Sequence, residues 1–492
     1  MESKSTNISV HVSRWSSTRK EDQFAVDNPA TGKPIAIVQG GGAAEIDEAV
    51  HAADKAFNET WRWVPPRERG RLLIDVAKTI REHREELAGL ESKENGKPLW
   101  QAAIDVEGCI GIFEYFGGLI GNIPGALLDM GPIYCSVFLE PYGVVGGILP
   151  FNWPPIHAAG KSAPALAVGN TVVLKPGEQA PLTVIRIVEL IQNILPKDVI
   201  HVVPGYGPVA GQALVSHPLV RKISFTGASP TGAAVLKLSA ENLTHTSLEL
   251  GGKNGIIIFA DADIDAAVNG AIEGAFYNQG EACTAASRII VHRSIYDEVV
   301  NRLAGVVSGI RVGDGADPDT QVGPMVSRQH QQRVLKYIAL GREEGAILAA
   351  QAKLPEDLRL KDGFFVPPTL FAHVRPDMRI AREEIFGPVT CVIPFDDEKE
   401  AVSIANGTEY GLVAGIYTRS HDLALRTARQ IDVGIVFVNN YFRGGIGMPF
   451  GGTKATGFGR EHCIETLYEY GRTKAVRVPS GIGQIPQWRM FG

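Results

Sequence analysis

The sequence predicts an α/β protein in which helices cover both faces of parallel sheets. Short, continuous apolar runs rich in β-branched residues recur from the middle of the chain onward. Each run is followed by turn residues and then by a stretch with helical spacing. At 492 residues the chain is also too long for one core, so we expect two or three domains. A ligand in such a sheet binds where the carboxyl ends of the strands meet.

The N-terminal part, from Asn28 to Tyr115, is predicted to be mostly helical. Ala43–Ala56 and Arg67–Leu90 carry apolar residues at three-and-four spacing, with charges on the opposite face. Pro65 and Pro66 precede the second stretch, where proline favours the start of a helix. We therefore expect at least two amphipathic helices before the first sheet.

Strands and helices then alternate in two series. The predicted strands of the first series are Gly143–Leu149, Thr171–Leu174, Val199–Val203, Lys222–Thr226 and Gly255–Phe259. The predicted helices between them are Ser162–Ala167, Pro181–Gln192, Pro208–Ser216 and Thr231–Ala240. The second series has predicted strands at Arg288–Val291, Ala346–Ala350, Val389–Phe395, Val413–Thr418 and Ile435–Val438, and predicted helices at Tyr296–Ser308 and Ser327–Glu343. The boundary between the series is expected near Gly251 and Gly252.

Two predicted strands, Ile133–Tyr142 and Thr473–Val478, fit neither series. An exposed strand presents unpaired backbone groups and is a hazard unless it finds a partner. We therefore expect both strands to pair with a neighbouring subunit.

Composition and charge exclude several kinds of partner. The net charge is −6 and no basic block occurs, so we expect neither nucleic acid nor membrane as a partner. The five cysteines are scattered and never stand in CxxC spacing, which argues against disulfides and a metal site and for a reducing compartment. The sequence has neither a secretory signal nor an apolar run of membrane-spanning length. We predict a soluble cytoplasmic protein that acts on a small molecule.

Cys283 is the candidate nucleophile. It follows the predicted helix Ile264–Asn278 and Gly280, a residue that suits the end of a helix, and it precedes the strand at Arg288. A lone cysteine is more often a small buried apolar residue. A helix C-terminus also disfavours a thiolate. Cys283 would therefore need a base, hydrogen-bond donors or a cationic cofactor to activate it.

Two polar residues beside glycine or proline could assist such a thiol. Glu249 precedes Gly251 and Gly252 at the end of a strand-like run, where it is either a solvated carboxylate or a general base whose pKa burial would raise. Asn152 begins an Asn-Trp-Pro turn, so it is either a turn former or a side-chain N–H donor to an oxyanion. A nucleophile, a base and an amide donor are the three groups that covalent acyl chemistry requires.

Several turns at predicted strand ends could bind a nucleotide. Lys175 and Glu178 follow one strand and could bond ribose hydroxyls, although a surface turn explains them equally well. The stretch Phe225–Gly232 closes another strand and opens a helix, where a phosphate could bind. Gly205–Pro208 is a similar turn, and neither stretch is a GxGxxG fingerprint. Their placement at successive strand ends makes a nucleotide plausible.

Seven motifs in order resemble the aldehyde dehydrogenase superfamily, over a span from about Asn28 to about Val478. They are Pro150-Phe151-Asn152-Trp153-Pro154, Lys175-Pro176-Gly177-Glu178, Phe225-Thr226-Gly227, Leu248-Glu249-Leu250-Gly251-Gly252-Lys253, Gly280-Glu281-Ala282-Cys283, Glu383-Glu384-Ile385-Phe386-Gly387-Pro388 and Pro449-Phe450-Gly451-Gly452. Seven matches in order are far more specific than any one of them. The resemblance implies NAD-dependent oxidation of an aldehyde to a carboxylic acid through a cysteine thiohemiacetal and thioester.

The resemblance also implies catalytic roles. Cys283 is implied as the nucleophile and Glu249 as the general base. Asn152 and the backbone N–H of Cys283 would form the oxyanion hole. Glu384 and Phe386 would position the nicotinamide ribose and ring.

NAD is implied as the cofactor, in preference to NADP. Glu178 can accept a hydrogen bond from a free 2′-hydroxyl and would repel a 2′-phosphate. Ala228 departs from the family, where many members have Ser, and one hydroxyl contact to phosphate is lost. The remaining implied cofactor residues are Leu149, Pro150, Phe151, Lys175, Gly207, Phe225, Thr226, Gly227, Gly232 and Leu250.

The family fold further implies three units. Residues 1–122 and 143–250 would form a Rossmann-type NAD-binding domain, and residues 251–452 an α/β catalytic domain. Residues 123–142 and 468–485 would form a β-hairpin oligomerisation element. The resemblance implies a homodimer or homotetramer.

The implied substrate tunnel has an aromatic mouth. The residues assigned to it are Trp153, His157, Gly160, Thr284, Tyr441, Phe442, Arg443, Ile446 and Phe450. This mouth predicts an aromatic or medium-length apolar aldehyde. Arg443 leaves a semialdehyde open, although an exposed arginine is the commoner role.

Three other functions stay open. An acylating dehydrogenase would transfer the acyl group to CoA, but Glu249 at the base position argues against it. A scaffold protein without turnover is disfavoured by the intact set of Cys283, Glu249 and Asn152. A cysteine hydrolase would need a histidine partner for its thiol, and no histidine lies in a motif that suggests one.

Overall fold

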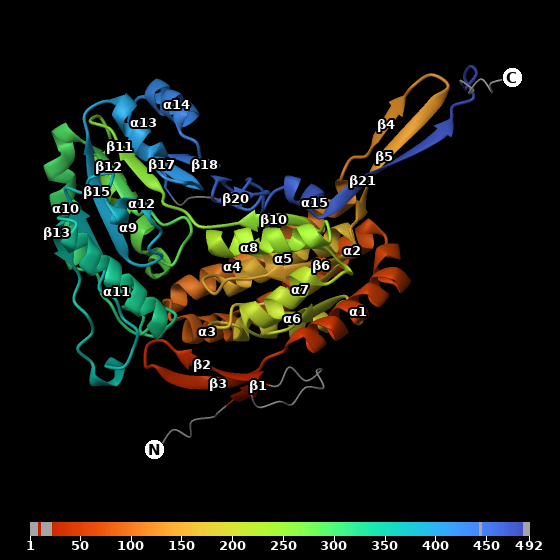
Figure 1. Cartoon of the computed structure of the whole chain (residues 1–492), viewed down its shortest axis with the longest axis horizontal. Coiled ribbons are helices and arrows are strands. Elements are labelled where there is room, and N and C mark those ends of the chain that lie inside the picture. Colours follow the sequence, from red (N-terminus) through yellow and green to blue (C-terminus); the bar gives the residue numbers. More distant parts are fainter. Residues whose placement is uncertain (1–7, 11–21, 442–444, 486–492) are drawn as a thin grey trace.

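The computed structural model describes residues 8–10, 22–441 and 445–485. Figure 1 shows a helix-rich body around one sheet, a second α/β unit beside it, and a β-sheet arm that projects from the body. Each of the two large units has strands flanked by helices. The predicted α/β class with parallel sheets is therefore confirmed.

The N-terminal region begins with a small sheet. Its strands are β1 (Ile8–Val10), β2 (Gln23–Asn28) and β3 (Lys33–Gln39), in the order β1-β3-β2. Four helices follow: α1 (Ala43–Glu59), α2 (Pro66–Glu82), α3 (Arg84–Asn95) and α4 (Leu99–Leu119). The prediction of a mostly helical start is confirmed, although the sequence did not reveal β3, where pairing with β2 decides the conformation. The single predicted helix 67–90 is two helices that meet at His83, whose ring Nδ1 lies 2.9 Å from the carbonyl oxygen of Thr79.

The first large sheet has six strands in the order β20-β10-β9-β6-β7-β8. They are β6 (Val144–Ile148), β7 (Thr171–Lys175), β8 (Ile200–Val202), β9 (Val220–Thr226), β10 (His245–Glu249) and β20 (Gly457–Phe458). All pairs are parallel except the one with β20. The helices are α5 (Pro154–Val168), α6 (Leu182–Gln192), α7 (Gln212–Ser216), which follows a π-turn at Gly207–Gly211, and α8 (Ser229–Glu241). Strands β6 and β7 are buried along their whole length, as expected for a sheet covered on both faces.

The second large sheet has seven strands in the order β13-β14-β15-β12-β11-β17-β18. They are β11 (Gly255–Ile258), β12 (Arg288–His292), β13 (Ile347–Gln351), β14 (Thr369–Ala372), β15 (Val389–Phe395), β17 (Val413–Tyr417) and β18 (Ile435–Val438). Only β13 and β14 are antiparallel. The helices are α9 (Ile264–Phe276), α10 (Tyr296–Ser308), α11 (Arg328–Glu343), α12 (Arg379–Arg382), α13 (Glu398–Asn406) and α14 (His421–Gln430).

One strand was assigned to the wrong series. The run Gly255–Phe259 forms β11, which lies in the second sheet between β12 and β17. The first sheet ends instead with β10, so the chain changes sheets between Glu249 and Gly255. Apolar composition predicts that both runs are buried strands, but not which sheet each one joins.

Local side-chain contacts start several helices of the second unit. Asp263 accepts the N–H of Ala266 at the start of α9, and Ser327 accepts that of His330 at the start of α11. Asp397 and Ser420 cap α13 and α14 in the same way. Each cap satisfies an N–H that the first turn of a helix leaves unpaired.

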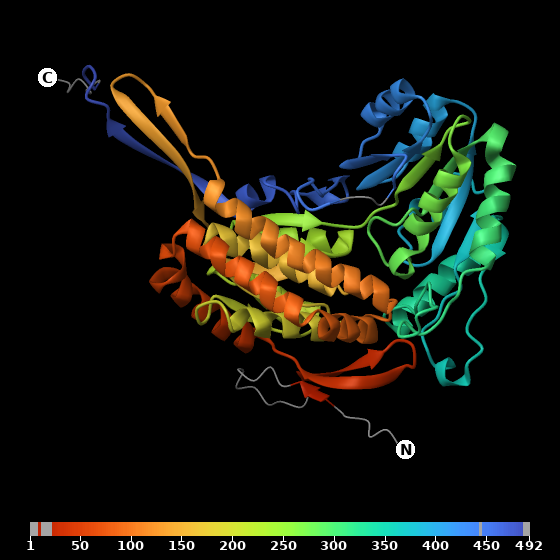
Figure 2. The ribbon, with the colours of Figure 1, turned by 180° about the vertical axis from the view of Figure 1, so that it is seen from behind.

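The arm is a three-stranded antiparallel sheet in the order β21-β5-β4. Its strands are β4 (Ala126–Asp129), β5 (Ile133–Pro141) and β21 (Gly471–Pro479), and α15 (Glu465–Glu469) precedes β21. Figures 1 and 2 show that the arm extends away from the body. The expectation that both extra strands pair with a neighbouring subunit is wrong for β5, because β21 and β4 of the same chain occupy its two edges. Apart from the sheets stands the short pair β16 (Tyr410–Gly411) and β19 (Thr453–Lys454).

Within the described part of the chain, no helix combines the length and apolar character that a bilayer crossing requires.

Candidate active site

Cys283 lies on a sharply bent turn between α9 and β12. Helix α9 ends at Phe276, two residues before the predicted end. Asn278 and Gln279 then take the left-handed conformation, with φ of 51° and 56°, and Gly280 follows with φ of 68°. A Cβ at Gly280 would lie 2.4 Å from the carbonyl oxygen of Gly387, so the close approach of two backbones requires glycine here. The bend separates Cys283 from the end of α9.

Cys283 lines a cavity of about 150 Å³ between the two large units. The residues that line it are Pro150, Phe151, Asn152, Thr226, Gly227, Ala228, Glu249, Leu250, Gly251, Cys283, His330, Arg333, Glu384 and Phe386. This set contains all three predicted catalytic residues and seven of the predicted cofactor residues. Hereafter it is called the polar cavity.

Burial shifts the pKa of two titrating groups of the polar cavity, Cys283 and Glu249, in favour of their neutral forms. Burial raises the pKa of the Cys283 thiol, and the nearby carboxyls of Glu384 and Glu249 raise it further. Burial also raises the pKa of Glu249 well above its usual range, and the charge of Glu461 adds to the effect. Both carboxyl oxygens of Glu249 are buried without a hydrogen-bond partner among the described residues. A substrate or a water molecule could therefore use them.

A buried ion pair between Lys161 and Glu461 influences the pKa of Glu249. Lys161 on α5 lies 2.7 Å from Glu461 and 3.1 Å from the hydroxyl of Ser224. Burial alone would raise the pKa of Glu461, but Lys161 and the imidazole of His462 hold it below its usual value. Glu461 therefore stays ionised and keeps Glu249 protonated to a higher pH.

The side chain of Asn152 is fixed by two contacts. Its Nδ2 donates to the carbonyl oxygen of Glu281 at 3.0 Å, and its Oδ1 lies 3.3 Å from Nε2 of His157. Burial lowers the pKa of His157 to about 3, so the ring is neutral. A carboxamide has two N–H donors, and the bond to Glu281 uses one of them.

The predicted cofactor residues follow successive strand ends of the first sheet. Leu149, Pro150 and Phe151 follow β6, Lys175 and Glu178 follow β7, Gly207 follows β8, Phe225–Gly227 ends β9, and Leu250 follows β10. Strands of a parallel sheet end at one edge, which is where such sheets bind nucleotides.

Contacts along this edge define its shape. Nζ of Lys175 lies 3.1 Å from Oε2 of Glu178, and about a third of the Glu178 side chain is exposed. A Cβ at Gly232 would lie 2.5 Å from the side chain of Leu250, so glycine allows α8 to pack against that residue.

Glu384 and Phe386 enter the polar cavity from the second unit. Glu384 accepts the N–H of Gly252 at 3.0 Å. Phe386 takes a positive φ of 60°, and its carbonyl oxygen lies 2.6 Å from Nε2 of His330. Burial lowers the pKa of His330 to about 4, so its neutral ring donates to that carbonyl.

Sequence reasoning did not find His330 and Arg333, which also line the polar cavity. Both lie on α11, a helix with many polar residues, and no local motif marks them.

The polar cavity suits the reactive end of a nicotinamide dinucleotide. The Thr226 hydroxyl and both oxygens of Glu249 are buried without partners among the described residues. A Cβ at Gly251 would lie 2.3 Å from the Glu384 carboxylate, and one at Gly227 would lie 2.6 Å from the ring of Phe225. The site therefore offers unsatisfied polar atoms beside backbone that is free of side chains.

A second cavity, of about 300 Å³, begins at Thr284, next to the cysteine. It is lined by Gly108, Ile112, Ile156, Thr284, Ile435, Phe437, Gly445, Ile446, Met448, Pro449, Phe450 and His462. None of these lining residues is an acid, a lysine or an arginine. Hereafter it is called the apolar cavity.

The predicted substrate residues fall into three groups. Thr284, Ile446 and Phe450 line the apolar cavity. Trp153, His157, Gly160 and Tyr441 are not among the described lining residues, whereas Ile156, a neighbour of the first three, is. A Cβ at Gly160 would meet His462 at 3.4 Å. Phe442 and Arg443 lie outside the described residues.

Comparison with known proteins agrees with this geometry. The model of the aldehyde dehydrogenase family matches residues 15–476. Aldehyde dehydrogenase citD of Monascus ruber is 52% identical over 475 residues, which cover 96% of this chain and 95% of that protein. Retinaldehyde dehydrogenase 3 of Mus musculus is 41% identical, with 97% of this chain and 94% of that protein covered. The crystal structure of betaine aldehyde dehydrogenase from Staphylococcus aureus in complex with NAD+ has a TM-score of 0.93 at 36% identity, with 97% of this chain and 95% of that one covered.

The fold is thus an α/β fold shared with an oxidoreductase whose structure was solved with NAD+. The chain belongs to the aldehyde dehydrogenase family, and the resemblance seen in the sequence is confirmed. It is an enzyme that oxidises aldehydes with a nicotinamide cofactor.

Proposed function

We propose that this enzyme oxidises an apolar aldehyde, aromatic aldehydes included, to the carboxylic acid with NAD and through a covalent thioester on Cys283. The observation that carries the proposal is that Cys283, Glu249 and Asn152, from three distant segments, line one cavity of about 150 Å³. Glu384 and Phe386 line the same cavity. Nucleophile, base and oxyanion donor are thus within reach of one reacting carbon.

In the first step the Cys283 sulfur attacks the aldehyde carbonyl. The oxyanion that forms is held by the second N–H of the Asn152 carboxamide and by the backbone N–H of Cys283. The bond from Asn152 to the Glu281 carbonyl fixes the carboxamide, so the free N–H is already oriented when substrate binds.

Glu249 serves as the base in both halves of the reaction. The raised pKa of the Cys283 thiol means that the thiol needs help to lose its proton. The raised pKa of Glu249 makes its carboxylate a stronger base than an exposed glutamate. After the acyl group has formed on sulfur, the same carboxylate activates water, which hydrolyses the thioester.

Bound NAD supplies the acceptor for the hydride that leaves the aldehyde carbon. Lys175 and Glu178 would hold its adenosine ribose, and Glu384 its nicotinamide ribose. Phe386 would back the nicotinamide ring, and its position is supported by the contact with His330. The partly exposed carboxylate of Glu178 supports NAD over NADP because it would repel a 2′-phosphate.

The apolar cavity supports the substrate class. Among the residues that the structure describes, its lining offers no cation to a substrate carboxylate, which disfavours a semialdehyde. Its volume of about 300 Å³ suits a medium-sized apolar group. Retinaldehyde dehydrogenase 3, a relative, is named for an apolar aldehyde.

For the assembly we propose a homodimer or homotetramer that uses the arm. The arm exposes several apolar side chains: Leu127, Leu128, Met130, Phe138, Val476 and Val478. Exposed apolar groups on a projecting sheet mark an interaction surface. We also propose the three units expected from the sequence, in which residues 123–142 and 468–485 form the oligomerisation element. We propose the cytoplasm as the location, because all five cysteines are free thiols.

The test is an NADH-absorbance screen with aromatic, aliphatic and semialdehyde substrates, each with NAD and with NADP. We expect NADH to form without CoA, with kcat/KM highest for apolar aldehydes and NAD. Strict dependence on CoA, or a preference for semialdehydes, would contradict the proposal.

A further inference from the structure

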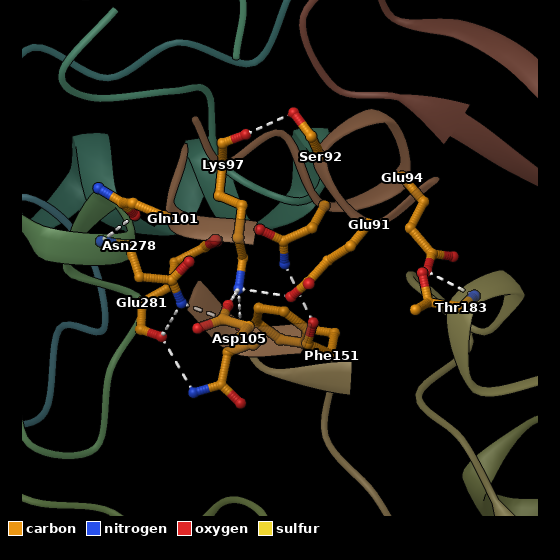
Figure 3. Close-up of polar contacts among 12 residues, drawn as sticks. Glu91, Ser92, Glu94, Lys97, Gln101, Asp105, Phe151, Thr183, Asn278 and Glu281 are labelled. Carbon is orange, nitrogen blue, oxygen red and sulfur yellow. Dashed lines mark hydrogen bonds and ion pairs between the residues drawn. The ribbon is translucent and has the colours of Figure 1, made fainter. Parts of the chain in front are cut away.

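A buried cluster that does not line the polar cavity contacts the backbone of the Asn152 turn. Lys97 lies between α3 and α4 and is fully buried. Its ammonium contacts Asp105 at 2.5 Å, Glu91 at 2.8 Å and the backbone carbonyl oxygen of Asn152 at 2.9 Å. Figure 3 shows the ammonium pointing between the two carboxyl groups. Two of its N–H groups donate to Asp105 and to the Asn152 carbonyl, and the ion pair with Glu91 is the third contact that fixes its position.

The cluster is not explained by a contribution to stability alone. Burial raises the pKa of Glu91 and of Asp105 despite the ammonium beside them, which shows that the site disfavours the charged forms of these carboxyls. Buried ion pairs often contribute no more to stability than apolar side chains of similar size. The polar group outside the cluster that Lys97 reaches is the carbonyl of Asn152.

Asn278 joins the same carbonyl to the turn that carries the cysteine. Its Nδ2 donates to the carbonyl oxygens of Asn152 at 3.0 Å and of Glu281 at 3.1 Å. Its backbone N–H donates to Oε1 of Gln101 on α4 at 3.0 Å. Glu281 lies two residues before Cys283, and its carbonyl oxygen also accepts a hydrogen bond from the side chain of Asn152. Asn278 therefore fastens the oxyanion donor and the nucleophile to each other.

We propose that Lys97 and Asn278 are positioning residues that fix the backbone of Asn152 relative to Cys283, so that the carboxamide N–H stays aimed at the developing oxyanion. The inference rests on the proposed function. Neither residue is among those that line the two cavities, and both act through the carbonyl of Asn152.

The first test is Asn278→Gly. Glycine takes a left-handed backbone without strain, so the variant removes the amide donors and keeps the turn. We expect a somewhat lower Tm, because two buried carbonyls lose a donor, together with an unchanged Kd for NAD and a kcat/KM for aldehyde lower by roughly tenfold to a hundredfold. Alkylation of Cys283 by iodoacetamide, which forms no oxyanion, should keep its wild-type rate. An equal loss of alkylation and oxidation would overturn the proposal, because it would show a general collapse of the turn.

Asn439→Gly is the matched control. Asn439 is also left-handed, with φ of 55°, and its Nδ2 also donates to a backbone carbonyl, that of Thr418. It should keep the wild-type kcat/KM.

A double-mutant cycle separates positioning from general damage. In the Asn152→Ala background, adding Asn278→Gly should cost nothing further, because the group being positioned is absent. Lys97→Arg keeps the positive charge but moves the N–H donors. In the Asn152→Ala background it should likewise cause no further loss of kcat/KM. Additive losses would overturn the positioning proposal. A fully active Asn152→Ala enzyme would instead show that the proposed oxyanion role is wrong.

Discussion

The two cavities on either side of the cysteine differ in how the chain builds them. The polar cavity takes most of its lining from turns at the ends of strands, where one short motif supplies several residues. The apolar cavity takes five lining residues from the segment 445–450, and the other seven come singly or in pairs from α4, α5, β18, Thr284 and His462. Reaction chemistry is thus set by local motifs and substrate choice by long-range packing. Changes on the two sides should therefore have different signatures.

The largest effect is expected for Cys283→Ala, which removes the nucleophile that both cavities share. Activity should fall at least about a thousandfold with every aldehyde, because no other group can form the acyl intermediate. Cys135→Ala, a buried cysteine on the arm, should keep full activity in the same NADH assay. Substantial residual turnover in Cys283→Ala would contradict the covalent mechanism.

Glu249→Gln should damage only the polar side. The amide cannot accept a proton, so we expect steady-state turnover to fall roughly a hundredfold or more. Wild-type kcat should rise with pH, because the pKa of Glu249 lies well above its usual range and only the ionised form is a base. Stopped-flow absorbance should show a burst of NADH that is slower than in the wild type, because the thiol must lose its proton to solvent. Turnover after the burst should be slower still, because water is far less acidic than a thiol and has no base to activate it. A variant with the wild-type steady state and pH profile would show that Glu249 is not the base.

Gly108→Ala should damage only the apolar side. The new Cβ would lie 2.4 Å from Cδ1 of Ile156, so both would be pushed into the cavity that they line. We expect kcat/KM for aromatic aldehydes to fall roughly tenfold, as a methyl group in a pocket can cause, while acetaldehyde is hardly affected. Gly118→Ala is the matched control on the same helix, since nothing lies within 4 Å of its Cβ. Equal losses for large and small aldehydes would contradict the assignment of this cavity.

The same contrast explains what the sequence could predict. Glu249 and Cys283 were found because glycine-marked turns follow their strand and helix. Gly108, Ile112 and Phe437 were not found, because each is one ordinary residue of a buried element and only folding brings it to the cavity.

Fold-level misses have the same origin. β3 was missed and β11 was placed in the wrong series, because pairing partners decide such strands and composition does not.

Glu178→Ala should change cofactor choice without touching either cavity. Removal of the carboxylate ends its repulsion of a 2′-phosphate and its bond to a 2′-hydroxyl. We expect the ratio of kcat/KM for NAD to that for NADP to fall several-fold. A change of this size is on the order of the free energy of one hydrogen bond to a charged group. An unchanged ratio would place the adenosine ribose elsewhere.

The smallest effect is expected on stability. Burial raises the pKa of Glu281 to about 8, so the folded protein holds this proton while the unfolded chain has lost it. Wild-type stability should therefore decline as the pH rises from about 4.5, the ordinary glutamate value, towards 8. Glu281→Gln lacks this titration, so its Tm relative to wild type should rise through that window. A Tm difference that does not change with pH would show that Glu281 is already ionised in the folded state.

The central claim is tested most directly by the mass of the Cys283 peptide after Glu249→Gln enzyme has reacted with NAD and an aromatic aldehyde. The account predicts that Cys283 gains the mass of the aldehyde less two hydrogen atoms, which is the mass of a thioester. NADH formation with an unmodified Cys283, or with the acyl group on another residue, would contradict it.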